Sequence, residues 1–209
     1  MPSDTSTRTE LGTPHGPAAA YLHEAPHPVA GLVLGHGAGG GVEAPDLLAA
    51  TSAALDAGLT VVLVEQPYRV AGRRSPAPAG QLDAAWIAVV EQLRAGALAG
   101  LPLVTGGRSS GARVACRTAA AVGAAGVLCL AFPLRPPRRD GTGPDRLPEL
   151  EAVAAPVLVV QGAGDAFGMP PPGPSRAVVE VRGNHSLRTD LRSVEAAVRA
   201  WLPSVLEPE

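Results

Sequence analysis

The chain has 209 residues, of which 46% are hydrophobic, and its formal net charge at pH 7 is −2. This length suits one domain that can bury a sizeable core. The near-neutral charge and the 3% aromatic content argue against nucleic-acid binding, which needs a basic surface or a base-stacking platform. All 17 basic residues are arginine, a bias typical of GC-rich bacterial genomes.

The cysteines and the N-terminal residues bear on the cellular compartment. Cys116 and Cys129 both lie in apolar segments and do not form a C-x-x-C pair, which is typical of buried, reduced thiols. The first residues contain no apolar signal-peptide core, and no unbroken apolar stretch reaches the about 18 residues of a membrane span. We therefore expect a cytoplasmic protein without a membrane partner. We also expect a monomer or a homodimer.

Short apolar runs bounded by glycine, proline or polar turns predict buried strands, and apolar residues at helical spacing predict helices. Residues 1–16 are polar and are expected to form a flexible segment, followed by one domain over 17–209. A short edge strand is predicted at 18–22. In chain order, the remaining elements are expected at 31–35 (strand), 45–55 (helix), 60–64 (strand), 82–93 (helix), 101–105 (strand), 110–121 (helix), 126–130 (strand), 156–160 (strand), 177–181 (strand) and 190–202 (helix).

This alternation of apolar strands and helices predicts an α/β fold. Continuous apolar strands need cover on both faces, so we expect a three-layer α/β/α sandwich around a mostly parallel sheet of about six or seven strands. In such sheets, ligands bind beyond the carboxyl ends of the strands. The residues that follow each strand are therefore the candidates for a functional site.

After the predicted strand 101–105, residues 107–111 match the pattern G-x-S-x-G with Ser109 at its centre. A serine on a tight turn between strand and helix has a strained backbone and an exposed hydroxyl, and small flanking residues let strand and helix approach closely. The following helix N-terminus favours developing negative charge. Ser109 is therefore the candidate nucleophile. The alternative is that residues 107–111 form an ordinary glycine-rich turn without a catalytic role.

Asp165 follows the strand predicted at 156–160, and His185 follows the strand predicted at 177–181. An aspartate in a glycine-rich loop is often a simple turn former, and a histidine in a polar turn is often a solvated side chain. The chain order Ser109, Asp165, His185 matches a triad in which serine attacks, histidine accepts its proton and aspartate orients the imidazole.

The glycine-rich loop after the first buried strand is the candidate for half of an oxyanion hole. We expect the backbone N–H groups of Ala38 and Ser110 to bind the oxyanion, because such a loop needs small side chains and the second donor follows the nucleophile. His36 and Gly37 lie in the same loop and are candidates for substrate contact.

The same loop also fits a dinucleotide-binding fingerprint, because Gly35, Gly37 and Gly40 have the spacing G-x-G-x-x-G and Glu65 ends the next strand. That motif opens a helix directly, whereas the helix pattern here begins only at Pro45. A nucleotide site would also leave the triad residues without a role. We expect no cofactor and no metal, since no lysine is present for a Walker motif and no Cys/His cluster has zinc-ligand spacing.

With these motifs, the chain resembles the α/β-hydrolases over about residues 29–203. More narrowly, it is similar to the small, nearly capless branch of testis-expressed protein 30 and subunit 3 of the NSL complex, with dienelactone-hydrolase-like proteins as near relatives. The motifs that carry this resemblance are residues 36–40, 67–69, 106–113, 132–137, 161–168 and 183–185. The resemblance implies a serine hydrolase with Ser109 as nucleophile, Asp165 as acid and His185 as base.

The sequence departs from this pattern in the segment 169–174, where relatives have a helix. Its proline content excludes a helix interior and leaves the seating of Asp165 and His185 open. The loop 135–147 is the remaining room for a lid, so an open, shallow site is expected.

Two functions fit these observations. The first is an esterase- or thioesterase-like hydrolase of a small-molecule ester, in which Arg69, Arg108 and Arg135 are candidates for binding a substrate carboxylate. Each arginine could instead be a solvated surface residue. The second is a binding or scaffolding module that uses the same fold without catalysis.

Overall fold

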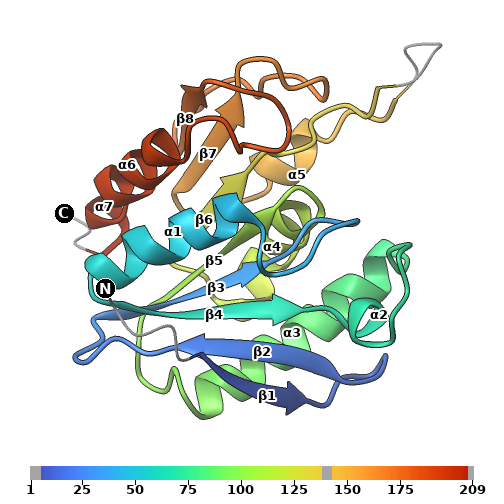
Figure 1. The fold of residues 1–209 in the computed structure, drawn as a ribbon, viewed down its shortest axis with the longest axis vertical. Coiled ribbons are helices and arrows are strands. Elements are labelled where there is room, and N and C mark those ends of the chain that lie inside the picture. The colour runs from blue at the N-terminus through green and yellow to red at the C-terminus, as the bar shows by residue number, and fades with distance from the viewer. Residues whose placement is uncertain (1–5, 138–142, 207–209) are drawn as a thin grey trace.

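The computed structural model describes residues 6–137 and 143–206. Its centre is an eight-stranded sheet with the order β1-β2-β4-β3-β5-β6-β7-β8 (Figure 1). β2 is antiparallel to both β1 and β4, and all other neighbouring strands are parallel. The strands are β1 (Thr7–Leu11), β2 (Ala18–His23), β3 (Ala30–Gly35), β4 (Leu59–Glu65), β5 (Leu103–Arg108), β6 (Gly126–Leu130), β7 (Val157–Gly162) and β8 (Arg176–Val181).

Helices cover both faces of this sheet, which confirms the predicted three-layer fold. Figure 1 shows α1 and α6 on one face and α3 and α4 on the other, and separate apolar clusters fill the space on each side. No helix in the described residues has the length and apolar character needed to cross a bilayer. The helices are α1 (Pro45–Asp56), α2 (Pro67–Val70), α3 (Ala79–Ala95), α4 (Ser110–Val122), α5 (Leu147–Glu151), α6 (Leu191–Trp201) and α7 (Pro203–Leu206).

The apolar patterns explain why these elements form. Every residue of β3 is buried, as expected for a central parallel strand with helices on both faces. In α3, Leu82, Trp86, Val89 and Leu93 recur at helical spacing and are buried against the sheet. The hydrophobic surface of each element is thereby removed from water by the neighbouring layer.

The N-terminal part of the chain contains a strand that the sequence analysis did not predict. Thr7–Leu11 form β1, paired antiparallel with Ala18–His23, so the sheet begins before residue 17. This extra strand brings the sheet to eight, slightly above the expected number. The side chains of β1 are almost all exposed, so its sequence lacks the apolar alternation that marks a strand. Residues 1–5 lie outside the described residues.

The connection from β7 to β8 contains no helix in the structure, as its prolines predicted. The two strands are nevertheless adjacent and in register, with Gly162 opposite Val181. The loops beyond them are joined by hydrogen bonds from Ala163 N–H to Val181 O (2.9 Å) and from Gly164 N–H to Gly183 O (2.8 Å). The loops that carry Asp165 and His185 therefore leave the sheet side by side without a crossover helix.

Candidate active site

Ser109 lies at the turn between β5 and α4 in a strained backbone conformation, with φ of 52° and ψ of −107°. A β-carbon at Gly107 or at Gly111 would come within 3.0 Å of backbone atoms of Gly35 in the neighbouring strand. Only glycine therefore allows the strand, the helix and β3 to meet this closely. The predicted G-x-S-x-G pattern thus corresponds to a sharp strand-to-helix turn.

The structure brings Ser109, His185 and Asp165 together in one hydrogen-bonded chain. His185 Nε2 lies 2.9 Å from Ser109 Oγ, and His185 Nδ1 lies 2.8 Å from Asp165 Oδ2. The carboxylate can only accept, so Nδ1 carries the proton and Nε2 is free to accept from the serine hydroxyl. The Asp165 side chain is 1% exposed and that of His185 is 22% exposed, so the imidazole is the part of the pair that solvent reaches.

Two further groups hold the Asp165 carboxylate. Gln161 Nε2 donates to Asp165 Oδ2 over 2.8 Å, and the Phe167 N–H donates to Oδ1 over 2.9 Å. Gln161 is fully buried, and its Nε2 group also lies within hydrogen-bond distance of the carbonyl oxygens of Phe132 (3.0 Å) and Gly168 (2.9 Å), so its two hydrogens are shared among three acceptors. These donors orient the buried carboxylate toward His185.

The Phe167 side chain packs on the candidate base. Its ring centroid lies 4.3 Å from that of His185, with 33° between the ring planes. The phenyl ring covers one side of the imidazole and restricts its rotation. The sequence analysis assigned no role to Gln161 or Phe167, although both belong to the motif over 161–168; their direction toward Asp165 and His185 is visible only in the folded chain.

The loop after β3 has few side-chain atoms and is held by buried polar contacts. The Tyr68 hydroxyl donates to the Ala38 carbonyl oxygen over 2.8 Å. Ser110 is the first residue of α4, so its N–H is one of the groups that the helix itself does not use. In the described residues, no backbone hydrogen bond from the Ala38 or Ser110 N–H was found. Both N–H groups thus remain the candidate oxyanion donors.

His36 does not have the setting of a substrate-binding residue. It is 3% exposed, its Nε2 accepts from the Gln66 N–H (3.1 Å) and its Nδ1 lies 2.8 Å from the Gly37 carbonyl oxygen. Burial lowers the pKa of His36 and keeps the ring neutral, with the proton on Nδ1. The imidazole therefore connects the loop after β3 to the chain after β4.

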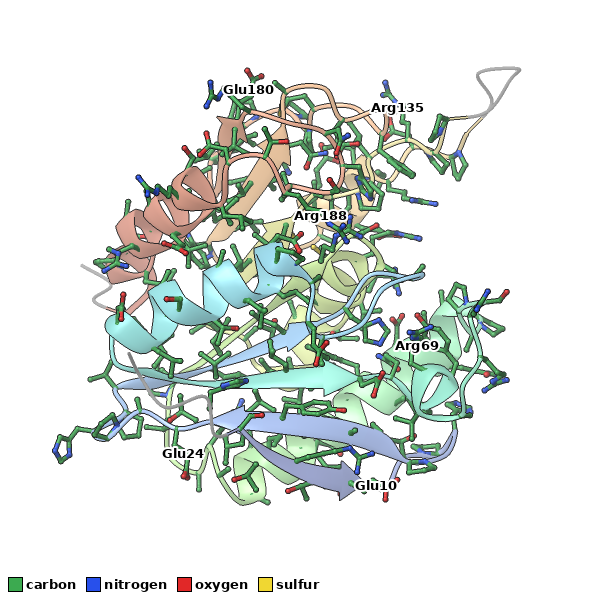
Figure 2. The ribbon with its side chains drawn as sticks, in the orientation of Figure 1. Glu10, Glu24, Arg69, Arg135, Glu180 and Arg188 are labelled. Carbon is green, nitrogen blue, oxygen red and sulfur yellow. The ribbon has the colours of Figure 1, made fainter. Side chains whose placement is uncertain are left out.

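The three candidate arginines do not converge on one point. Arg108 turns inward, where Nε donates to Asp46 and Nη2 donates to the His185 carbonyl oxygen, so its guanidinium is engaged inside the protein and its role in binding substrate stays a prediction. Arg135 pairs with Asp145 over 2.6 Å and its side chain is 63% exposed. Figure 2 shows Arg69 on α2 and Arg135 on the loop after β6, nearer the β8 edge of the sheet.

Arg69 stays a predicted substrate contact; its Nε is buried and has no hydrogen-bond partner among the described residues. Gly37 lies against the Arg108 guanidinium, where a β-carbon would be 2.7 Å from Nη1. The described residues contain no group of three or more His, Cys, Asp or Glu side chains that could hold a metal ion.

Comparisons with known proteins agree with this architecture. A family model described as an alpha/beta hydrolase domain matches residues 28–196. No curated protein matches the sequence. Among solved structures, a lidless serine hydrolase, XC6422 from Xanthomonas campestris, is similar with a TM-score of 0.76 and 19% identity, over 100% of this chain and 98% of that one.

Two further solved structures have the same fold. Est1E from Butyrivibrio proteoclasticus has a TM-score of 0.75 and 16% identity, over 95% of this chain and 98% of that one. Dienelactone hydrolase from Anabaena variabilis has a TM-score of 0.73 and 17% identity, over 95% and 96% of the two chains. The family model covers most of the domain described above, from β3 into α6. The chain belongs to the alpha/beta hydrolase family.

Proposed function

We propose that this protein is a serine-dependent acyl hydrolase that cleaves a small carboxylic ester or thioester through an acyl-enzyme on Ser109. The observation that carries the proposal is the hydrogen-bonded chain from Asp165 through His185 to Ser109, at a serine with a φ of 52°. Such a chain activates a weak nucleophile, because the base accepts the hydroxyl proton while the acid holds the correct tautomer.

In the acylation step, Ser109 Oγ attacks the ester carbonyl carbon while His185 Nε2 accepts the hydroxyl proton, over the 2.9 Å that separates the two atoms. The imidazolium that forms is stabilised by Asp165 through Nδ1 (2.8 Å). His185 then protonates the departing alcohol or thiol, and the acyl group remains on Ser109. Deacylation repeats these proton transfers with water as the nucleophile. The steps use only side chains and water.

The negative charge on the carbonyl oxygen in the transition state would be bound by the N–H groups of Ala38 and Ser110. The Tyr68 hydroxyl holds the Ala38 carbonyl at 2.8 Å, which fixes the peptide next to the donor. The N-terminus of α4 adds a favourable partial positive charge at Ser110. Removing one such donor typically costs about 3 kcal/mol of transition-state stabilisation.

The absence of a separate cap domain in the described residues favours small substrates that bind in an open site. Similar solved structures include an esterase, Pf2001 from Pyrococcus furiosus, and a dienelactone hydrolase, which supports carbonyl–oxygen bond cleavage as the reaction class. We also propose the narrower relationship to the nearly capless branch described above and a cytoplasmic location. Arg69, with its unpartnered Nε, is the remaining candidate for contact with a charged substrate group.

The test is intact-mass analysis after reaction with a fluorophosphonate probe, combined with turnover of p-nitrophenyl acetate. Wild type should take up one adduct and Ser109→Ala should take up none. Ser204→Ala is the matched control, because that hydroxyl, in α7, donates to the carbonyl oxygen of Trp201 at the end of α6. A folded wild-type protein that neither reacts nor turns over ester would favour a binding or scaffolding module instead.

A further inference from the structure

Arg108 precedes Ser109 directly and ends β5, yet its side chain points away from the solvent at the site. Its Nε donates to Asp46 Oδ2 over 3.2 Å, and its Nη2 donates to the His185 carbonyl oxygen over 2.8 Å. The Arg108 side chain is 18% exposed and that of Asp46 is fully buried. The Arg108 guanidinium thus connects the Asp46 side chain to the backbone of His185.

We propose that Arg108 is a positioning residue that sets the place of the base His185 relative to Ser109, and that Asp46 holds it in the required orientation. This inference rests on the proposed function, since it concerns how the same three catalytic groups are aligned. It gives Arg108 an internal role in place of contact with substrate. Its contacts with three separate segments of the chain support it.

The first support is the setting of Asp46. It lies in the first turn of α1, and its Oδ1 accepts from the Leu47 N–H over 3.1 Å. Burial raises the pKa of Asp46, and the adjacent Arg108 charge opposes that shift. A buried carboxylate needs a partner of opposite charge with good hydrogen-bond geometry. Asp46 therefore fixes one side of the guanidinium, which leaves the other side to face His185.

The second support is the irregular backbone around His185. Gly183 has a φ of 120° and Leu187 has a φ of 48°, so the base lies in a turn and not at a regular position of a strand or helix. The ring is fixed at Nδ1 by Asp165, and backbone hydrogen bonds hold the turn at Gly183 and Asn184, which leaves the peptide after His185 to be held. The hydrogen bond from Arg108 to the His185 carbonyl provides it from the residue next to the nucleophile.

The third support is the contact with the loop after β3. A β-carbon at Gly37 would lie 2.7 Å from Arg108 Nη1, so the guanidinium packs against the residue before Ala38. One rigid, planar group thus touches the loop of the candidate oxyanion donor, the N-terminal turn of α1 and the loop of the base. A lysine presents a single ammonium group on a flexible chain and does not reproduce this fork.

The kinetic test compares Arg108→Lys, Arg108→Met and Asp46→Asn with Arg199→Met. The control removes an arginine from another Arg–Asp pair, Arg199 with Asp56 (2.8 Å), on the exposed side of α6. We expect kcat for p-nitrophenyl acetate to fall about 100-fold in Arg108→Met, with KM within about twofold, because a misplacement of about 1 Å costs that much. Arg199→Met should retain the wild-type kcat.

Arg108→Lys separates positioning from mere charge neutralisation. Lysine keeps a cation beside Asp46, so it should recover most of the thermal stability lost in Arg108→Met while kcat stays at least about tenfold below wild type. A lysine variant with wild-type kcat would overturn the proposal, because the charge alone would then suffice. A folded Arg108→Met or Asp46→Asn with wild-type kcat would overturn it as well.

A second measurement does not depend on activity. The Nδ1 proton of His185, hydrogen-bonded to Asp165, should give a low-field proton NMR signal that is absent in His185→Gln. We expect this signal to be lost or strongly shifted in Arg108→Met and unchanged in Arg199→Met. If wild type neither turns over ester nor reacts with the probe, the proposed function fails, and the NMR comparison still decides the positioning role. An unchanged signal in a folded Arg108→Met would overturn it.

Discussion

Gly111, the second residue of α4, packs directly against the backbone of Gly35 at the end of β3. A β-carbon at position 111 would lie within 3.0 Å of Gly35 backbone atoms, and these atoms cannot move without displacing a central strand. The turn that carries Ser109 is therefore held by close contact between two glycines that lie far apart in the sequence. This contact leads to the first prediction.

Gly111→Ala should lower the free energy of unfolding by about 1–3 kcal/mol, because the added methyl overpacks the contact with β3. It should also reduce reaction of Ser109 with a fluorophosphonate, since the turn shifts. Urea denaturation and the labelling rate measure these effects. Gly80→Ala is the control: it lies in α3 with nothing within 4 Å of an added β-carbon, so stability should stay the same or rise slightly. Equal stability of the two variants would contradict the packing argument.

Asp165→Asn should reduce kcat for ester hydrolysis by about 10³–10⁴-fold with little change in KM. The amide can donate to His185 Nδ1, which favours the tautomer with its proton on Nε2 and prevents acceptance of the Ser109 proton. Asp56→Asn is the control, because that carboxylate pairs with Arg199 in an exposed position. A loss of less than tenfold in a folded Asp165→Asn protein would argue against the assigned acid.

Gln161→Met should destabilise the protein by about 1–3 kcal/mol and lower kcat. The change takes the amide donor away from the Gly168 carbonyl oxygen, leaves the Phe132 carbonyl oxygen with the Leu134 N–H alone, and removes one hydrogen bond to Asp165. The matched control is Gln92→Met on α3, whose amide also donates to two carbonyl oxygens but is exposed. Thermal unfolding and kcat of both variants decide whether burial makes the difference.

The pKa of His36 is lowered from its ordinary value of 6.5, mainly by burial, while Glu65 raises it and Arg69 lowers it. Below about pH 6.5, the unfolded chain therefore binds a proton at His36 that the folded protein does not bind. The stability contribution of neutral His36 is present above pH 6.5 and is lost as the pH falls below that value, by at most about 1.4 kcal/mol per pH unit.

His36→Gln removes this titration. The stability difference between wild type and His36→Gln should be larger at about pH 8 than at about pH 5.5, because only the wild type loses stability through this group as its unfolded form becomes protonated. Urea denaturation at the two pH values measures the difference. A difference that stays constant or grows toward acidic pH would contradict a buried neutral histidine.

At the end of β5, glycine both favours a turn and allows neighbouring strands to approach closely. The sequence pattern indicates only the turn. The predicted strand ended before Gly106, because consecutive glycines favour turns, whereas the observed strand continues through Gly107 to Arg108. A β-carbon at Gly106 would meet Leu128 in β6, and one at Gly107 would meet Gly35. The glycines are required by neighbouring strands, and propensity along the chain does not contain that information.

The sequence by itself determined the alternation of strands and helices, the turn around Ser109 and the chain order of Ser109, Asp165 and His185. These features are local: they depend on the apolar period of each segment and on small residues within a few positions of one another. Sequence patterns of this kind therefore sufficed for the fold class and for the three residues that the structure joins by hydrogen bonds.

Only the tertiary structure decided where the polar side chains around these residues point. Arg108 and His36 have polar side chains and lie next to the candidate site in the sequence, as substrate-binding residues do. In the structure, Arg108 instead bonds to Asp46 and His185, and His36 bonds to Gln66 and Gly37. Except for Gly37, these partners lie far from Arg108 and His36 in the sequence, and a buried polar side chain points toward the groups that can complete its hydrogen bonds. That long-range requirement for hydrogen bonds is absent from any local sequence pattern.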